Sequence, residues 1–226
     1  MSGWAAWSPL ASEPGEWRAL RLPAAVVEAV DFPACRFVEA GLRRRLSPLA
    51  RMTLHVARQC AADRPELRVV FASRHGEVNR THLMLEALAG DEELSPTLFS
   101  LSVHNAIAGL LSIIRRDTAP ATAVAAGAES LGAGLLQAAL EQMACPEQPV
   151  LLLYADLPLL PFYRDVDPAL QQPLALAMLL QAGGEPWRLS RDSGAQADGA
   201  QGVALAQALA GAADEAVLAG RRLARA

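Results

Sequence analysis

The side chains best suited to chemistry lie near the middle of the sequence, where His104 is followed directly by Asn105. An imidazole titrates near neutral pH, so His104 could act as a general acid or base. A His-Asn pair at the start of a helix is, however, more often a cap and a hydrogen-bonding corner. His75 and His82 are seven positions apart, but "RHGEVNR" contains a glycine and indicates a loop. No metal site is therefore expected.

Four serines are candidate nucleophiles, namely Ser100, Ser102, Ser112 and Ser130. None of them sits in the Gly-x-Ser-x-Gly pattern of a nucleophile elbow. Ser130 is nearest to a predicted strand-to-helix turn, where a helix N-cap or first-turn residue is the more economical interpretation. Cys145 follows a predicted helix, so it lacks the helix N-terminus that activates a thiolate. No Walker A or dinucleotide-binding glycine pattern occurs, and no cofactor is expected.

Composition narrows the class of protein. Of the 226 residues, 52% are hydrophobic and 19% charged, which is typical of a folded protein on the apolar side and suggests that part of its apolar surface is covered by a partner. The net charge of −4 gives no basic footprint for nucleic acid. The run Arg43, Arg44 and Arg45 is too short to change this, and we interpret it as a solvated helix face.

The three cysteines and the absence of long apolar runs indicate a cytoplasmic protein. Cys35, Cys60 and Cys145 are far apart and odd in number, so neither a disulfide framework nor a zinc site is predicted. The start "MSGWAAWSPLASEPGEW" does not resemble a secretory signal. No apolar run reaches the roughly 18–20 residues of a membrane-spanning helix.

Short apolar runs alternate with amphipathic stretches along the chain, which predicts an α/β layered sheet. Strands are predicted at 67–73, 118–126 and 148–156, and as an adjacent pair at 173–183 and 187–193. Helices are predicted at 43–63, 79–90, 103–114, 130–143 and 202–226. The segment 24–30 has a mixed signal, and we interpret it as a strand or a turn of helix. We expect a single domain over 1–226.

Helix ends can be placed from cap residues. Pro48 is tolerated in the first turn of its helix, and Asn79 or Thr81 is a possible N-cap with Gly90 as the stop of the following one. The last predicted helix is rich in alanine and carries Arg221, Arg222 and Arg225 near its C-terminal end, where positive charge is favourable.

The order of four segments carries a resemblance to a known family. They read "LSPTLFSLSVHNAIAGLLSI", "APATAVAAGAESLGAGLLQAAL", "VLLLYADLPLLPFY" and "PLALAMLL". The sequence resembles the N-terminal half of the β-ketoacyl synthases of the thiolase-like superfamily, from about Pro23 onward. It is most similar to the short chain-length-factor-like subunits of aryl polyene and related polyketide or fatty-acid-type clusters. The resemblance implies half of an α-β-α-β-α fold, a mixed sheet with helices packed on it.

The resemblance also implies where chemistry is missing. Active ketosynthases carry a cysteine at the turn after the strand, at the N-terminus of a buried helix. Laying "AVAAGAES" on that pattern puts Ala128 at or beside the cysteine position. Two further catalytic histidines belong to the family's C-terminal half, before which this sequence ends. We therefore expect no condensation by this chain alone, and pairing with a full-length β-ketoacyl synthase to which acyl carrier protein delivers acyl groups.

In ketosynthase dimers the strand before the nucleophile lies at the subunit interface, so "PATAVAAGAES" is expected to face a partner. By resemblance, the candidate interface or cavity residues are His104, Asn105, Ala128, Glu129 and Ser130. Two other functions stay open. One is an independent acyl transferase or hydrolase using Ser130 or Ser102 with His104. The other is a homodimeric scaffold that binds carrier protein.

Overall fold

The centre of the protein is a five-stranded mixed sheet. The computed structural model describes residues 1–226 except 23–28, 63, 164, 166–171 and 197–199. The strands are β1 (Gly3–Trp7), β2 (Arg68–Ala72), β3 (Ala121–Val124), β4 (Val150–Asp156) and β5 (Leu174–Leu180). Their order is β1-β5-β4-β2-β3, with β2 parallel to β3 and β4, and β5 antiparallel to β4 and β1. The predicted α/β fold class with a mixed sheet is confirmed.

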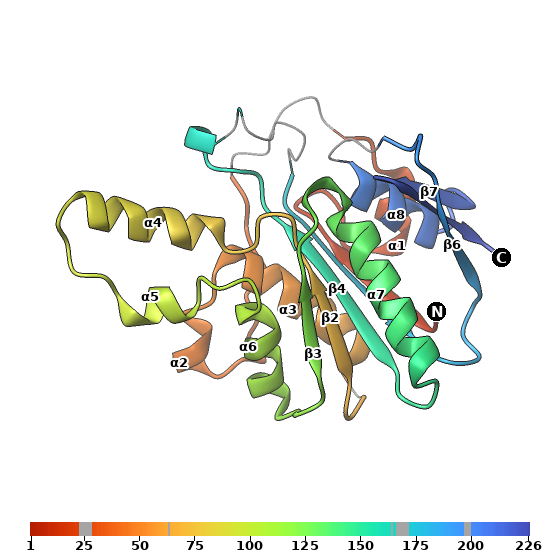
Figure 1. Cartoon of the computed structure of the whole chain (residues 1–226), viewed down its shortest axis with the longest axis horizontal. Helices are drawn as coiled ribbons and strands as arrows, with labels where there is room; N and C mark the ends of the chain where they lie inside the picture. Colours follow the sequence, from red (N-terminus) through yellow and green to blue (C-terminus); the bar gives the residue numbers. More distant parts are fainter. Residues whose placement is uncertain (23–28, 63, 164, 166–171, 197–199) are drawn as a thin grey trace.

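Helices cover both faces of this sheet (Figure 1). They are α1 (Pro14–Ala19), α2 (Ala40–Arg43), α3 (Pro48–Ala61), α4 (Val78–Ala89), α5 (Pro96–Ser100), α6 (Ala106–Arg115), α7 (Ser130–Ala144) and α8 (Gln201–Leu209). Successive strand residues point to opposite faces, so Phe71 and Leu153 enter the core with α3 and α6. Val70 and Leu152 enter the core with α7 and α8. Two buried faces explain why the central strands are continuous apolar runs.

Local sequence signals set several boundaries. The helix predicted over 43–63 begins only at Pro48, because α2 ends at Arg43 and Ser47 is the N-cap of α3. Ser47 caps α3 by accepting a hydrogen bond from the amide of Ala50 at 3.0 Å, and Pro48 lies in the first turn. Gly90 is the C-cap of α4. The N-cap prediction for α4 is wrong, because the helix begins after Glu77, before both Asn79 and Thr81. The predicted segment 24–30 lies mostly outside the described residues.

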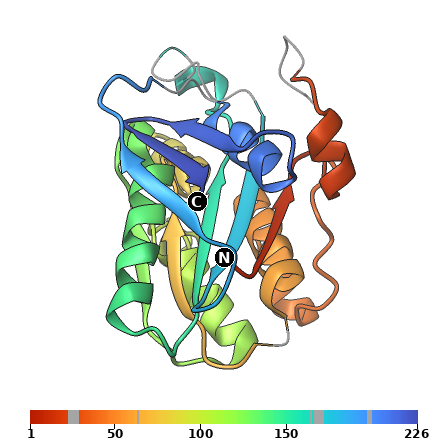
Figure 2. The same ribbon diagram turned by 90° about the vertical axis from the view of Figure 1, so that its right-hand side faces the viewer.

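The C-terminal segment is not the long helix predicted over 202–226. Helix α8 ends at Leu209, and two strands follow, β7 (Glu215–Leu218) and β8 (Arg221–Arg225). They form a second sheet with β6 (Trp187–Arg191) in the order β6-β8-β7 (Figure 2). Gly220, at a φ of +68°, makes the tight turn between β7 and β8. The alanine content predicted a helix here. The residues of β7 and β8 instead alternate in burial, as strand residues do, and the turn at Gly220 lets the two strands pair.

The predicted pairing of 173–183 with 187–193 is also wrong. β5 is bonded on one side to β4 and on the other to β1, so both of its edges are occupied and β6 pairs with β8 instead. β1 was not predicted as a strand, because "GWAAW" contains no β-branched residue. Within the described part of the chain, none of the helices is long and apolar enough to cross a membrane.

Candidate functional site

The turn between β3 and α7 is the frame in which a nucleophile would sit. It is a single 3-10 turn, Gly127–Glu129, entered at Gly127 with a φ of +56°, and α7 begins directly after it at Ser130. Ala128 lies in this turn and is exposed, as are its neighbours from 125 to 129. The strand–turn–helix layout expected around Ala128 is present, and its methyl group offers no nucleophilic atom.

Ser130 closes this turn from inside. Its side chain is buried, with 1% exposure, and its Oγ accepts a hydrogen bond from the amide of Ala126 at 2.9 Å. The same hydroxyl donates to the carbonyl of Gly127 at 2.8 Å. A serine hydroxyl has a single proton, which is spent here on a backbone carbonyl. The interpretation of Ser130 as a first-turn residue is confirmed.

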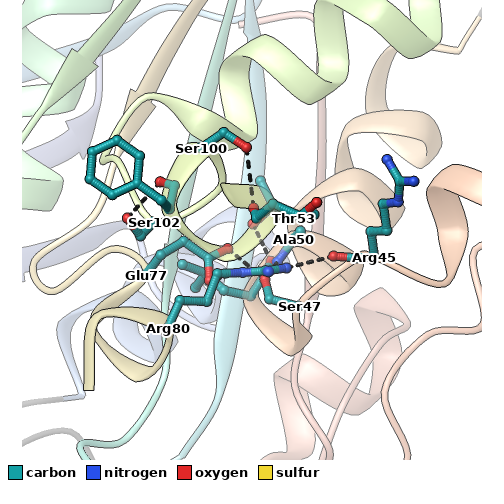
Figure 3. Close-up of polar contacts among 11 residues, drawn as sticks. Arg45, Ser47, Ala50, Thr53, Glu77, Arg80, Ser100 and Ser102 are labelled. Carbon is teal, nitrogen blue, oxygen red and sulfur yellow. Dashed lines mark hydrogen bonds and ion pairs between the residues drawn. The ribbon is translucent and has the colours of Figure 1, made fainter. Parts of the chain in front are cut away.

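The other three candidate serines are bound in the same way. Ser100, Ser102 and Ser112 each donate to the carbonyl three residues earlier, at 3.2, 2.8 and 2.8 Å respectively. Figure 3 shows the first two turned back onto their own backbone. Serines near helix ends commonly make such local hydrogen bonds. No imidazole contacts any of these hydroxyls in the hydrogen bonds of the described residues, so none of them has an activating base.

Gln201, at the start of α8, braces the turn from the other side. Its Nε2 donates to the carbonyl of Ala128 at 2.9 Å, while its Oε1 accepts from the amide of Ala219 at 3.2 Å. The side chain is buried. Glu129 lies beside the same loop, where a Cβ on Gly220 would come within 3.2 Å of its carboxylate. Sequence reasoning missed Gln201, whose only signal was a polar residue opening an alanine-rich helix.

His104 holds the end of β3. Its Nε2 lies 3.0 Å from the carbonyl of Val124, so this nitrogen is the protonated donor and Nδ1 carries no proton in the neutral ring. The ring is tilted against Phe71, with 5.6 Å between centroids. A Cβ on Gly76 would lie 2.8 Å from Nδ1, which explains a glycine there. The hydrogen-bonding corner is confirmed for His104, but Asn105 occupies the N-cap of α6 without a side-chain capping bond.

A buried carboxylate that the sequence did not single out fixes the neighbouring loop. Asp156, at the end of β4, is 1% exposed and accepts hydrogen bonds from the Ser73 hydroxyl and the amides of Arg74 and His75, at 2.8 to 3.1 Å. Burial raises the pKa of this carboxyl group. Ser73 in turn accepts from the amide of Gly76 at 2.8 Å, so the network places the backbone beneath His104.

A second buried network ties α4 to α3 (Figure 3). The Ser47 hydroxyl donates to Glu77 at 2.5 Å, and Arg80 donates to the other oxygen of the same carboxylate at 3.1 Å. Arg80 also donates to the carbonyl of Arg45 at 2.6 Å. Burial raises the pKa of Glu77, against the opposing effects of Ser47 and Arg80. Beside this network is a pocket of about 420 Å³ between the starts of α3, α4 and α5.

The described residues contain no cluster that could bind a metal ion, and two of the three cysteines have a raised thiol pKa. No group of three or more His, Cys, Asp or Glu side chains among them could hold a metal ion. The three cysteines are free. Burial raises the pKa of Cys60 to about 12 and raises that of Cys35 as well, which keeps both protonated at neutral pH.

One edge of the sheet is open. β3 pairs only with β2, and in the described part of the chain its other edge has no strand beside it. α6 and α7 flank this strand (Figure 1) and present exposed apolar side chains, Ile113 at 66%, Leu140 at 51% and Met143 at 76%. Unpaired strand edges between apolar helices are typical of association surfaces.

The helix α4 extends away from the sheet together with α5 (Figure 1). Its network with α3 lies at its first turn, while further along, Leu83, Leu85 and Leu88 are each more than half exposed. Phe99 of α5 is exposed as well. We call α4 and α5 the apolar arm. The leucines and the phenylalanine of this arm are exposed to water. Covering them with another apolar surface would lower the free energy.

Comparison with known proteins agrees with this architecture. Residues 15–222 match the family described as β-ketoacyl synthase, N-terminal domain. The chain superposes on a chain of the ketosynthase (ApeO) in complex with its chain length factor (ApeC) from Xenorhabdus doucetiae, with a TM-score of 0.85, 27% identity and complete coverage of both chains. None of the curated proteins matches.

More distant structures share the fold. The ishigamide ketosynthase/chain length factor aligns with a TM-score of 0.61 and 16% identity, over 85% of this chain and 67% of the other. A β-ketoacyl synthase from Burkholderia phymatum aligns with a TM-score of 0.60 and 13% identity, over 95% of this chain and 70% of the other. The strand–turn–helix frame, the mixed sheet and the sequence match over 15–222 thus agree, and the chain belongs to the β-ketoacyl synthase N-terminal domain family with a thiolase-like fold.

Proposed function

We propose that this protein is a non-catalytic, chain-length-factor-like subunit that pairs with a full-length β-ketoacyl synthase. The partner supplies the nucleophilic cysteine and the two histidines of the condensation. This chain stabilises the partner and shapes the cavity for the growing acyl or polyene chain, which arrives on acyl carrier protein. The pair works in the cytoplasm, in polyene, polyketide or fatty acid biosynthesis.

The observation that carries the proposal is the end-to-end match to a chain of the Xenorhabdus ketosynthase–chain length factor complex. Complete coverage in both directions means that the matched chain has about the length of this one. The Burkholderia synthase chain is longer, because this chain spans 70% of it. A short member of the family in a ketosynthase complex fits the role of a partner subunit.

The turn after β3 supports the absence of catalysis. If Ala128 occupies the cysteine position, its methyl group cannot attack a thioester. The groups around it serve structure, because Ser130 bonds the turn's own backbone, His104 bonds Val124 and Gln201 bonds Ala128. The serine-dependent alternative has less support, since each of the four candidate hydroxyls donates to a nearby carbonyl.

The open edge of β3 and the apolar arm support pairing. A partner strand added to β3 would satisfy its free backbone groups. The exposed side chains Ile113, Leu140 and Met143 of the flanking helices add apolar area that a partner could cover. The arm adds Leu83, Leu85 and Leu88 to the apolar area available for contact. Obligate interfaces are typically more apolar than transient ones.

Co-expression with a full-length β-ketoacyl synthase tests the proposal. We expect a 1:1 complex by size-exclusion chromatography with light scattering. The complex should condense malonyl groups on carrier protein, and should lose that activity when the partner's cysteine is replaced by alanine. Ser130→Ala and His104→Ala in this chain should leave the chemical step intact, provided that the complex still forms.

Two outcomes would contradict the proposal. The first is an isolated chain that turns over acyl thioesters and loses that activity with Ser130→Ala or His104→Ala, which would favour the serine-dependent enzyme. The second is a homodimer that excludes the synthase and binds carrier protein, which would favour the scaffold.

A further inference from the structure

A second cavity in the described part of the chain lies at the opposite end of the sheet from the Ala128 turn. It is a groove of about 780 Å³ at the lower end of the sheet in Figure 1, where α6 ends and where β2, β3 and β4 begin. Its walls come from the last turn of α3, the last turn of α6 and the segments that precede the three strands. The proposed synthase-related function makes no use of this groove.

Positive charge is concentrated around this groove. Four arginines line it, namely Arg58, Arg64, Arg115 and Arg116, against two acidic residues, Glu66 and Asp117. Asp63 lies outside the described residues. The whole chain carries a net charge of −4, so the groove has the opposite sign to the protein. Local charge of this kind attracts anions.

One arginine and one acid are already committed to the fold. Arg115 donates to the carbonyls of Ala61 and Arg64 at the end of α3. Asp117 accepts from the amides of Leu67 and Ala119, both at 2.9 Å, and lies 3.7 Å from Arg115. These two groups therefore largely neutralise each other and the helix end. The remaining charge of the groove comes from the other three arginines and is partly offset by the exposed Glu66.

Those three arginines are differently placed. Arg58 lies over the ring of Phe37, with 4.9 Å between the guanidinium carbon and the ring centroid, a contact that leaves its N–H groups free to donate at their edge. No acidic side chain pairs with Arg64 or Arg116 in the ion pairs of the described residues. Arg64 and Arg116 are both exposed at the rim.

A buried donor also lacks an acceptor. The Nε of Arg115 has no hydrogen-bond partner, although it is shielded from solvent. This nitrogen lies 3.7 Å from the carboxylate of Asp117, which is too far for a hydrogen bond, so the ion pair leaves its N–H without an acceptor. An acceptor oxygen entering the groove could supply the missing bond. This observation is independent of the charge count and points to the same chemistry.

The groove also has an apolar part. Leu54, Ala57 and Leu111 line it but are themselves buried, whereas Phe37 and Ile114 are half-buried and keep accessible apolar surface. An inorganic ion would leave Phe37 and Ile114 uncovered. A ligand that fits both parts has an apolar body against the helices and an anionic head among the arginines.

We infer that this groove binds a small amphipathic anion, an aliphatic or aryl body carrying one carboxylate or phosphate group. The head is held by Arg58, Arg64 and Arg116 and accepts from the Nε of Arg115. The body lies against Phe37 and Ile114. The site is a binding site separate from the Ala128 turn, and it does not depend on the proposed partner.

Isothermal titration of the full chain with octanoate tests this inference. We expect octanoate to bind, octan-1-ol to bind at least about tenfold more weakly because it lacks the charge, and affinity to fall as salt is raised. Octyl phosphate, titrated in parallel, decides between a carboxylate and a phosphate as the preferred head group. Octanoate itself is the probe, so the result needs no knowledge of the natural ligand.

The double variant Arg58→Gln/Arg116→Gln should weaken octanoate about tenfold while octan-1-ol binds unchanged. Both side chains are exposed, so the variant should fold, which circular dichroism checks. The matched control is Arg188→Gln/Arg191→Gln, on exposed positions of β6, which removes the same charge and should bind octanoate normally.

Four results would overturn the inference. One is the absence of octanoate binding at millimolar concentration. Another is equal binding of octanoate and octan-1-ol. The third is equal loss of affinity in the β6 control, which would make the effect one of net charge. Binding of poly-glutamate without octanoate would assign the arginines to an acidic protein partner and would also overturn it.

Discussion

The two edges of the five-stranded sheet differ in how far the chain itself covers them. At the β1 edge, α1 and α3 lie beside the strand (Figure 2), and the fully buried Trp17 donates its indole N–H to the carbonyl of Ala6 at 3.4 Å. At the β3 edge, Ile113, Leu140 and Met143 remain in solvent. The chain covers one edge with its own first helix and leaves the other for association. The two edges are thus protected independently, and the unprotected β3 edge indicates a surface for association.

Trp17→Ala should be the most disruptive substitution. It removes a fully buried indole from the covered edge and leaves a cavity, at a cost of about 3–5 kcal/mol in the free energy of unfolding. Urea denaturation followed by circular dichroism measures the change. Met143→Ala is the matched control at the open edge, and it should change stability by less than about 0.5 kcal/mol. Equal effects at both edges would remove the contrast.

The covered edge also shows what the sequence could reveal. The central strands were predicted because each is one contiguous apolar run, buried on both faces. β1 was missed because alanines and tryptophans have no clear strand pattern, and its pairing with β5 is made by residues about 175 positions away. The second sheet was missed because two of its strands, β7 and β8, lie in an alanine-rich stretch with high helix propensity. The turn at Gly220 makes this stretch a pair of strands instead.

The candidate site also has one part that could be predicted from the sequence and one part that could not. The turn at Ala128 and the first-turn role of Ser130 could be predicted from one short stretch. The residues that hold the turn could not, because their partners are distant in sequence. Gln201 is 73 positions from Ala128, and Asp156 is 83 positions from Ser73. Propensity and periodicity describe neighbours along the chain, whereas these contacts exist only after the sheet has formed.

Gln201→Ala should loosen the turn at the end of the open edge. It leaves the buried amide of Ala219 without its acceptor and frees the carbonyl of Ala128, so we expect a loss of about 1–3 kcal/mol in stability. Hydrogen exchange should then speed up at residues 126–130. Gln59→Ala, at an exposed position of α3, is the control and should change neither quantity. Unchanged exchange at the turn would show that Gln201 does not brace it.

Met143→Asp sharpens the contrast from the open side. A carboxylate in the middle of an apolar contact must be desolvated, so affinity for the full-length synthase should fall at least about tenfold, or about 1.4 kcal/mol. The stability of the isolated chain should not change, because Met143 is 76% exposed. Light scattering of the co-expressed pair measures the first effect and urea denaturation the second. Arg188→Asp, on the second sheet, is the control, and weakening of the complex by that change would place the interface elsewhere.

Glu77→Gln gives the smallest effect and tests the base of the apolar arm. Burial raises the folded-state pKa of Glu77 above its usual 4.5, so the folded protein holds this proton more tightly than the unfolded chain does. Stability should therefore decline as pH rises from about 4.5 through the raised pKa, by at most about 1.4 kcal/mol per pH unit. The variant, which has no titrating group there, should show a shallower decline in urea denaturation over that range. Glu147→Gln, an exposed change of the same kind, should leave the slope as it is. An unchanged slope in Glu77→Gln would mean that the carboxylate is compensated by Ser47 and Arg80, and that the arm's attachment to α3 does not respond to pH.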